Sequence, residues 1–207
     1  MAPFLWGCFT IDVKNIAVKI IMKNILFFGD SLTAGYGLPN ADEESFPALV
    51  GQKISIGYPD YRVINAGLSG DTSAGGLKRL DYWITPPISV FVLELGINDI
   101  LRSIPPQITL QNLQAIISKI KTKYPNVKIA LMGMQIPEFL HSQTAIQFRG
   151  VYQQLANKNQ TALVPFFLDG VAGKANLNLP DHIHPNAAGY KIIAEKVWPV
   201  IRTLLIS

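Results

Sequence analysis

Five short apolar runs without polar alternation constrain the fold of this chain more than any other feature of its sequence. Such runs are typical of strands that are covered on both faces, as in a parallel sheet. Helix-like segments separate them, so the chain reads as five strand–helix units without an internal repeat. This order predicts an α/β fold, a three-layer α/β/α sandwich around a five-stranded parallel sheet. We expect strands at 25–28, 61–65, 90–95, 127–132 and 162–164, and helices at about 41–56, 74–84, 107–124, 143–160 and 186–206.

The composition fits one folded domain and excludes several classes of protein. Apolar residues make up 49% of the 207 residues and charged residues 15%, whereas intrinsic disorder requires low hydrophobicity and high charge. The net charge is +4, and its densest cluster, Lys119, Lys121 and Lys123, falls near the end of a predicted helix, where cations suit the helix dipole. No recognition motif accompanies this cluster, so we expect no nucleic-acid partner. The single Cys8 excludes an internal disulfide, and no apolar stretch approaches the length of about 18 residues typical of a transmembrane segment.

Residues 1–22 do not belong to the strand–helix pattern. Apolar residues fill 15 of these 22 positions, but Asp12, Lys14 and Lys19 interrupt them after the first short apolar run. A secretory signal has the opposite order, with its charges before an unbroken apolar segment. We interpret residues 1–22 as an N-terminal extension of unknown structure, added by cloning or by an upstream start, and 23–207 as a single domain. Without a well-formed export signal, the default expectation is a cytoplasmic protein.

Ser31 follows the first strand, in the run Gly29-Asp30-Ser31-Leu32. Ligands of parallel α/β sheets bind beyond the carboxyl ends of the strands, so this loop is a candidate site. A serine there can act as a nucleophile at the sheet edge. Asp30 or Ser31 can equally well cap the following helix, because both residue types favour that position.

His184 and Asp181 form a second candidate group, just before the last predicted helix. A serine hydroxyl is a weak nucleophile and needs a base, usually imidazole, that a third group orients. Aspartate three residues before histidine can turn back and hold Nδ1, which leaves Nε2 free to face the serine. The alternative is a polar turn with His182 and His184 at the surface. Two histidines without a further histidine or cysteine cluster do not predict a metal site, and we place His141 in a loop outside this group.

Gly70 and Asn98 lie in the loops after the second and third strands. The backbone N–H of Gly70 and the side-chain NH₂ of Asn98 can both donate to an oxyanion, and removing such a donor typically costs a factor of about 10²–10³ in rate. A glycine loop in which Asp71 or Thr72 caps the next helix explains the first segment equally well. Each of these loops is a weak signal when taken alone.

Taken in order, the four segments resemble the sequence blocks of the GDSL (SGNH) hydrolase family. The blocks are Gly29-Asp30-Ser31-Leu32, the glycine segment around Gly70, Gly96-Ile97-Asn98-Asp99 and Asp181-His182-Ile183-His184. The resemblance covers about 23–206 and is nearest to the bacterial thioesterase I/lysophospholipase L1/arylesterase branch. It implies the flavodoxin-like SGNH hydrolase fold.

The resemblance also implies a role for each residue of the site. Ser31 is the nucleophile, His184 the general base and then acid, and Asp181 the carboxylate that orients it. The Ser31 and Gly70 N–H groups and the Asn98 side chain form the oxyanion hole, and neither a cofactor nor a metal is required. Ile97 stands where many close relatives have a second glycine, and the segment Gly133–Leu140 lacks the Asn-Tyr-Gly run often found there, so chain-length preference does not carry over.

The expected activity is hydrolysis of carboxylic esters through an acyl-enzyme, with acyl thioesters or lysophospholipids as further candidate substrates. The partner is therefore a small-molecule ester or thioester, and a monomer is the default expectation. Carbohydrate acetylesterase activity is an alternative within the family, and a non-catalytic flavodoxin-like binding module is an alternative outside it. Relatives of this branch are often exported, which leaves periplasmic or secreted localisation open. Met134, Ile136, Phe139 and Leu140 either form an apolar lip that favours acyl chains or pack a helix against the fourth strand.

Overall fold

A five-stranded parallel sheet forms the centre of the molecule. The computed structural model describes residues 22–135 and 143–206. Its strand pairs are all parallel, and the strand order across the sheet is β2-β1-β3-β4-β5. The predicted α/β fold with five parallel strands is confirmed. The strands are β1 (Lys23–Gly29), β2 (Tyr61–Gly67), β3 (Ile88–Glu94), β4 (Lys128–Met132) and β5 (Ala162–Val164).

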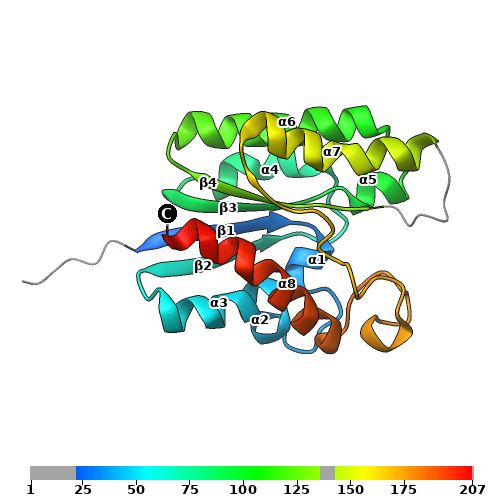
Figure 1. The fold of residues 1–207 in the computed structure, drawn as a ribbon, viewed down its shortest axis with the longest axis horizontal. Coiled ribbons are helices and arrows are strands. Elements are labelled where there is room, and N and C mark those ends of the chain that lie inside the picture. The colour runs from blue at the N-terminus through cyan, green and yellow to red at the C-terminus, as the bar shows by residue number, and fades with distance from the viewer. Residues whose placement is uncertain (1–21, 136–142, 207) are drawn as a thin grey trace, which may run out of the picture.

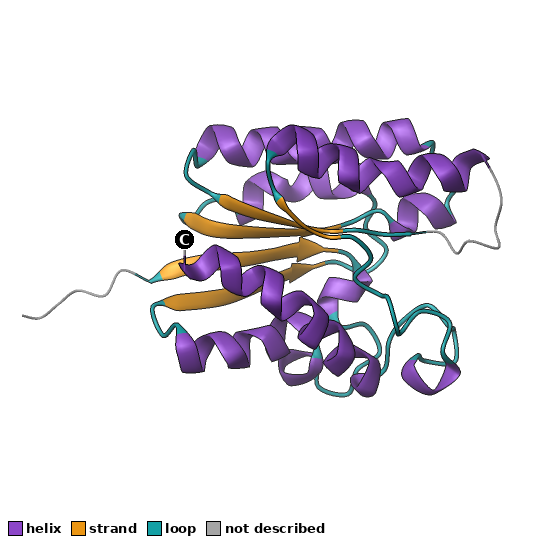
Figure 2. Cartoon of the chain, viewed as in Figure 1, coloured by secondary structure: helices purple, strands orange, loops and turns teal. Residues whose placement is uncertain are grey.

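Helices cover both faces of the sheet and complete the three layers seen in Figure 1. On one face α6 packs against α4 and α7, and on the other α3 packs against α8. Short helices and loops gather at the carboxyl ends of the strands (Figure 2). The helices are α1 (Ser31–Ala34), α2 (Ala41–Glu44), α3 (Phe46–Gly57), α4 (Ser73–Trp83), α5 (Ile97–Leu101), α6 (Pro106–Lys123), α7 (Gln143–Asn159) and α8 (Ala187–Ile206), with a 3₁₀ turn at Ala175–Leu177.

Strand β1 shows why the apolar runs lack polar alternation. Its residues Ile25, Leu26, Phe27 and Phe28 have no exposed surface, although successive side chains of a strand point to opposite faces. Helices cover both faces, so every one of these positions must be apolar. Each buried side chain of this kind contributes about 1.5–3 kcal/mol relative to an exposed one. The edge strand β2 is only partly buried, and its sequence is correspondingly more polar.

The chain leaves β1 and β3 toward opposite faces of the sheet. The connection after β1 runs through α3, and the one after β3 runs through α6 on the other face. Because β1 and β3 are neighbours in the sheet, their connections diverge at this point. This switch point is where parallel α/β sheets bind ligands, and it positions the loops that carry Ser31 and Asn98.

Two details differ from the sequence prediction. The predicted helix 41–56 is divided into α2 and α3 at Ser45, which is extended (ψ 153°). Pro47 explains this break, because it has no N–H to continue the hydrogen-bond ladder of α2 and is tolerated in the first turn of α3. The segments after β1 and β3, expected to be loops, contain the short helices α1 and α5.

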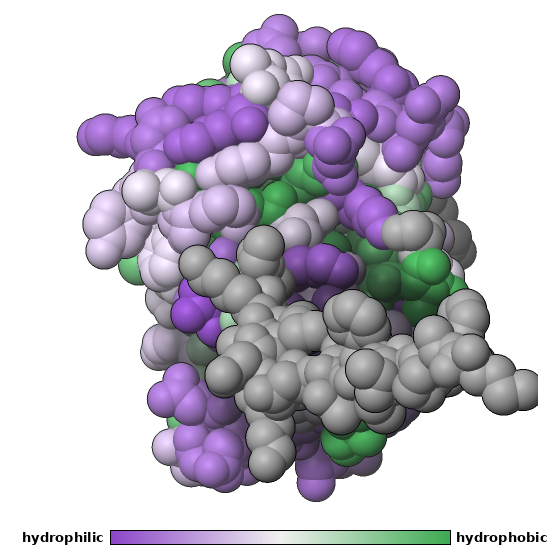
Figure 3. Space-filling view, turned by 90° about the vertical axis from the view of Figure 1, so that its left-hand side faces the viewer, coloured by the Kyte–Doolittle hydropathy of each residue, from purple (hydrophilic) through white to green (hydrophobic). Residues whose placement is uncertain are grey.

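The face at the amino ends of the strands lies opposite this switch point. In the coloured part of Figure 3, hydrophilic residues predominate toward the top and lower left of that face, with smaller hydrophobic areas between them. A hollow of about 430 Å³ there is lined by residues that include Lys23, Tyr61, Lys123 and Lys128. None of the predicted site residues lines this hollow.

Candidate active site

The side chains of Ser31, His184 and Asp181 form a continuous hydrogen-bonded chain. Ser31 Oγ lies 2.9 Å from His184 Nε2, and His184 Nδ1 lies 2.7 Å from Asp181 Oδ2. Ser31 and His184 are 153 residues apart in the sequence, so only the fold brings them together. The imidazole thus has a carboxylate on one nitrogen and a hydroxyl on the other, an arrangement in which it can take the hydroxyl proton.

Ser31 begins α1 directly after β1. Asp30 caps this helix, and its Oδ1 accepts a hydrogen bond of 3.0 Å from the Leu32 N–H. In this turn Asp30 therefore caps the helix, while the next residue, Ser31, presents the hydroxyl group. Ser31 as a whole residue retains only 6% of its surface.

The loop before α8 holds Asp181 in a fixed orientation toward the ring. Its Oδ1 accepts hydrogen bonds from the N–H groups of Ile183 (2.9 Å) and His184 (3.0 Å), which leaves Oδ2 for the imidazole. Partial burial by itself raises the pKa of Asp181, but these bonds outweigh it and lower that pKa to about 2. The carboxylate therefore remains ionised throughout the neutral range. His182, within the loop, adopts a positive φ of 59° and takes no part in this chain of contacts.

Tyr36 contacts the imidazole, which the sequence did not predict. Its ring centroid lies 4.6 Å from that of His184, with the planes inclined by 46°. Tyr36 is 51% exposed, so it forms part of the rim of the site. The sequence signal for this position was the pair of flanking glycines, Gly35 and Gly37, because glycine enters left-handed conformations readily. Both adopt φ of 78° in the structure.

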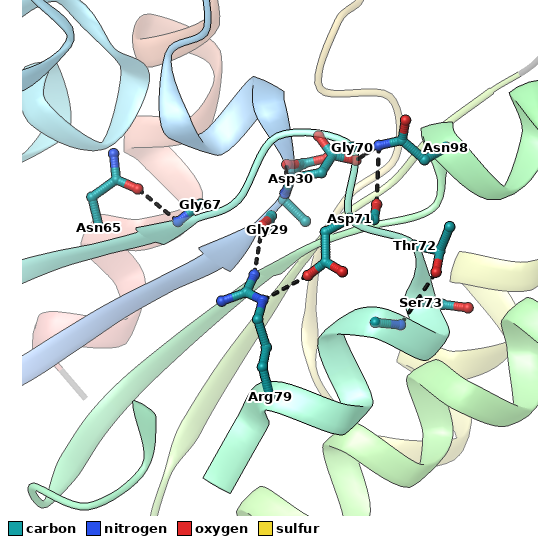
Figure 4. A network of polar contacts seen from close by, with 12 residues as sticks. Gly29, Asp30, Asn65, Gly67, Gly70, Asp71, Thr72, Ser73, Arg79 and Asn98 are labelled. Carbon is teal, nitrogen blue, oxygen red and sulfur yellow. Dashed lines mark hydrogen bonds and ion pairs between the residues drawn. The ribbon is translucent and has the colours of Figure 1, made fainter. Parts of the chain in front are cut away.

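Gly70 and Asn98 approach each other at the carboxyl end of the sheet, as Figure 4 shows. Gly70 adopts φ of 78°, a left-handed conformation that glycine enters without steric cost. Asn98 lies on α5, and its Nδ2 donates to the Asp71 carbonyl oxygen (3.0 Å) and to Asp30 Oδ2 (3.2 Å). Both N–H groups of the carboxamide are thus already engaged, so donation to an oxyanion requires that one of these bonds be shared or exchanged.

Two buried carboxyl groups, Asp30 and Glu94, lie behind Ser31. Glu94 Oε2 accepts hydrogen bonds from Thr33 Oγ1 (2.7 Å) and from the Asp30 N–H (3.2 Å). Burial raises the pKa of Asp30 well above its usual range, and the charge of Glu94 raises it further. Burial also raises the pKa of Glu94, against the lowering effect of its hydrogen bonds. Glu94 lies within the predicted strand 90–95, and a carboxylate in an otherwise apolar strand is a signal of a buried polar group that needs partners.

Gly29 makes room for this arrangement. A Cβ at this position would lie 2.1 Å from Thr33 Oγ1 and 2.5 Å from Glu94 Oε2, far inside contact distance. Position 29 therefore requires glycine, because any side chain would displace the neighbouring groups that pack beneath the Ser31 turn.

Asp99, also fully buried, joins three helices next to the site. Its carboxylate accepts hydrogen bonds from the Ser73 N–H and hydroxyl and from the Thr109 hydroxyl. Ser73 begins α4 and Thr109 lies on α6, so Asp99 fixes α5, and with it Asn98, between them. Ile97, the first residue of α5, is partly buried against the hydrophobic core.

The predicted apolar lip is not supported at the residue that can be checked. Met134 is buried in the hydrophobic core, which corresponds to the packing alternative, while Ile136, Phe139 and Leu140 lie outside the described residues, as does His141. Within 22–135 and 143–206, no group of three or more His, Cys, Asp or Glu side chains is arranged to hold a metal ion. No helix in this part of the chain has the length and hydrophobicity needed to cross a membrane.

Comparison with known proteins agrees with this architecture. The model of the GDSL-like lipase/acylhydrolase family matches residues 27–192. Esterase TesA of Pseudomonas aeruginosa is 36% identical over 205 residues, which cover 99% of both chains. Thioesterase 1/protease 1/lysophospholipase L1 of Escherichia coli K12 is 36% identical over 172 residues, or 83% of this chain and 79% of that relative. The crystal structure of TesA has a TM-score of 0.81 and 38% identity over 88% of this chain and 99% of its own.

The fold is an α/β sandwich that brings a serine, a histidine and an aspartate into contact at the carboxyl ends of its strands. The chain belongs to the GDSL-like lipase/acylhydrolase family. The predicted resemblance is thereby confirmed, as is the expectation of an enzyme of the carboxylic ester hydrolase type.

Proposed function

We propose that this protein hydrolyses carboxylic esters, with acyl thioesters and lysophospholipids as further substrates, through a Ser31–His184–Asp181 triad. The observation that carries the proposal is the 2.9 Å contact between Ser31 Oγ and His184 Nε2, with Asp181 Oδ2 at 2.7 Å from the other ring nitrogen. The low pKa of Asp181 supports it, because an ionised carboxylate stabilises the imidazolium that forms when His184 takes a proton.

The reaction consists of two acyl transfers. Ser31 Oγ attacks the substrate carbonyl carbon while His184 Nε2 takes the hydroxyl proton, and the carbonyl electron pair moves onto oxygen. The N–H groups of Ser31 and Gly70 and the amide of Asn98 receive this oxyanion. As the carbonyl re-forms, the bond to the alcohol or thiol breaks and His184 returns the proton to that leaving group. Water then attacks the acyl-enzyme by the same steps, which releases the acid and restores Ser31.

Apolar side chains at the rim favour acyl substrates over sugar acetates. The tilted Tyr36 ring contacts the His184 ring. Leu68 precedes Gly70 by two residues, and Leu101 follows Asn98 by three. All three are large apolar side chains with more than half of their surface exposed, and they lie in the segments that carry the proposed site. A hydrocarbon chain can cover such surface, and each CH₂ that it buries contributes about 0.8 kcal/mol.

The test is turnover and covalent labelling of the purified protein. Ser31→Ala is expected to lower kcat by a factor on the order of 10⁶ and to abolish labelling by a fluorophosphonate. Ser55→Ala is the matched control, because Ser55 is an exposed serine whose hydroxyl donates to the Gln52 carbonyl oxygen of its own helix. A panel of short and long p-nitrophenyl esters, acyl-CoAs and acetylated sugars then assigns the substrate class. Esterase activity retained by pure Ser31→Ala protein would refute the proposed mechanism, and preference for acetylated sugars would refute the proposed substrate class.

A further inference from the structure

Arg79 has three anchors between the strand that carries Ser31 and the loop that carries Gly70. Its Nε donates to Asp71 Oδ2 at 2.6 Å and its NH2 group donates to the Gly29 carbonyl oxygen at 2.8 Å. The guanidinium carbon also lies 4.0 Å from the centroid of the Phe28 ring. Figure 4 shows the side chain reaching from α4 to both partners at once. Side chains of a helix lean toward its N-terminus, which directs Arg79 back to this end of the sheet.

The two hydrogen-bonded partners of Arg79 adjoin the proposed oxyanion donors. Gly29 precedes Ser31 by two residues, so its carbonyl belongs to the peptide next to the one that supplies the Ser31 N–H. Asp71 follows Gly70 directly, and its carbonyl oxygen accepts the hydrogen bond from Asn98 Nδ2. Arg79 therefore connects the segments of all three donors, although it does not reach a substrate itself.

The proposed oxyanion hole requires a rigid connection between the segments that carry its donors. The Ser31 and Gly70 N–H groups come from loops on two different strands, and an oxyanion hole works only when its donors are held at the correct spacing before the reaction. The Asp71 and Arg79 side chains are only 6% and 17% exposed, so water competes weakly for their contact. A planar guanidinium can hold a carboxylate and a carbonyl in one plane while it stacks on a ring, which an ammonium group cannot do.

We propose that Arg79 is a positioning residue that sets the spacing of the oxyanion donors. The proposal rests on the proposed serine hydrolase function. An ion pair that only stabilises the fold would give the same contacts, so the experiment must separate the loss of rate from the loss of folded protein.

The first variant is Arg79→Lys, which keeps the charge beside Asp71 but cannot hold Asp71 and Gly29 together. We expect kcat to fall about 10- to 100-fold, because a displacement on the order of 1 Å costs up to about 10²-fold in rate, while KM stays nearly constant. Labelling of Ser31 by a fluorophosphonate should slow by a similar factor, since that reaction uses the same donors. Lys78→Gln is the matched control, because it removes a cation from the adjacent, exposed position of α4 and should change neither rate.

A double variant covers the case in which Arg79→Lys folds poorly. Asp71→Asn with Arg79→Gln removes both charges, so no buried charge lacks a partner, and the introduced glutamine cannot bridge two acceptors as arginine does. We expect this protein to be folded by circular dichroism and still slow in kcat. Rates equal to wild type in a folded single or double variant, or a loss of kcat that follows the folded fraction alone, would overturn the positioning role. Wild-type protein without Ser31-dependent turnover would instead overturn the proposed function, so the two failures are distinguishable.

Discussion

Asp30 and Glu94 place two carboxyl groups in the interior, next to the residue proposed as nucleophile. Each has no exposed surface, and burial raises the pKa of both. Two ionised carboxylates at such close range would repel each other in a medium of low dielectric constant. A proton kept by Asp30 or Glu94 would reduce the negative charge behind Ser31, near the proposed position of the oxyanion.

This pair predicts a specific dependence of stability on pH. Groups whose pKa is higher in the folded state contribute stability that is complete below their unfolded pKa, about 4 for carboxyl groups, and that is lost as pH rises through the folded value. Glu94→Gln removes one of the two titrations and the charge that raises the pKa of Asp30. The free energy of unfolding should therefore decline less steeply above pH 4 in Glu94→Gln than in wild type, by about 1.4 kcal/mol per pH unit for each proton no longer retained.

Urea unfolding at a series of pH values measures this difference. Glu43→Gln serves as control, because Glu43 is exposed and its replacement should leave the slope of wild type unchanged. Parallel curves for wild type and Glu94→Gln would mean that the buried pair does not retain a proton.

At the scale of elements, one hydrogen bond ties α8 to the helix that carries Ser31. The Tyr190 hydroxyl donates to the Leu32 carbonyl oxygen at 3.0 Å, and both residues are fully buried. Burial, together with the charges of Glu94 and Asp30, raises the pKa of Tyr190, so the hydroxyl stays protonated and remains a donor. Because α8 directly follows the loop of His184, this bond connects the segments that carry Ser31 and His184.

Tyr190→Phe should therefore affect stability and activity together. It leaves a buried carbonyl without this donor, which costs about 1–3 kcal/mol, and it loosens α1 relative to α8. We expect a lower free energy of unfolding and a lower kcat at a temperature where the protein is folded. Tyr82→Phe is the control, because Tyr82 is largely exposed and should lose neither. A free energy of unfolding equal to that of wild type in Tyr190→Phe would show that water or a local rearrangement supplies a new donor to the Leu32 carbonyl oxygen.

The elements that the sequence predicted well are those whose periodicity reflects burial. The strands stand out as apolar runs because both faces of the sheet are covered, and α6 and α8 each begin within one residue of the predicted start. The break at Ser45 and the four- and five-residue helices α1 and α5 were missed, since they depend on single residues such as Pro47 and on capping by Asp30.

The site was predictable only to the extent that its residues lie in recognisable motifs. Ser31, Gly70, Asn98, Asp181 and His184 were all singled out from the sequence, and the structure gathers them at one edge of the sheet. Arg79 lies inside a helix where periodicity gives it no special character. Its proposed role depends on the carbonyl group that its guanidinium reaches. The strand order and register determine which carbonyl this is.

At the scale of the whole molecule, the length of the sheet separates the proposed site from the end at which the chain enters β1. The proposed site occupies the carboxyl ends of β1, β2 and β3, while the chain enters β1 at the opposite end. The first residues of β1 already contact neighbouring segments at this end. The Lys23 N–H donates to the Asp60 carbonyl oxygen (2.8 Å), and Asn24 Nδ2 donates to the Pro87 carbonyl oxygen (2.7 Å).

We propose that the hydrolase domain begins at Lys23, so that removal of residues 1–21 leaves a folded and active enzyme with Met22 as its first residue. Every strand contact of Lys23 and Asn24 is kept in this variant, and the site lies at the far end of the sheet. Because a change of 1 kcal/mol shifts the melting temperature of a domain of this size by about 2–4 °C, we expect a shift below about 2 °C and an unchanged kcat/KM. Removal of residues 1–24 is the matched comparison: it deletes the contacts to Asp60 and Pro87 and should lower the melting temperature clearly. Equal destabilisation by both deletions would show that the domain extends into the residues before Met22, because only contacts made by those residues are lost in the shorter deletion.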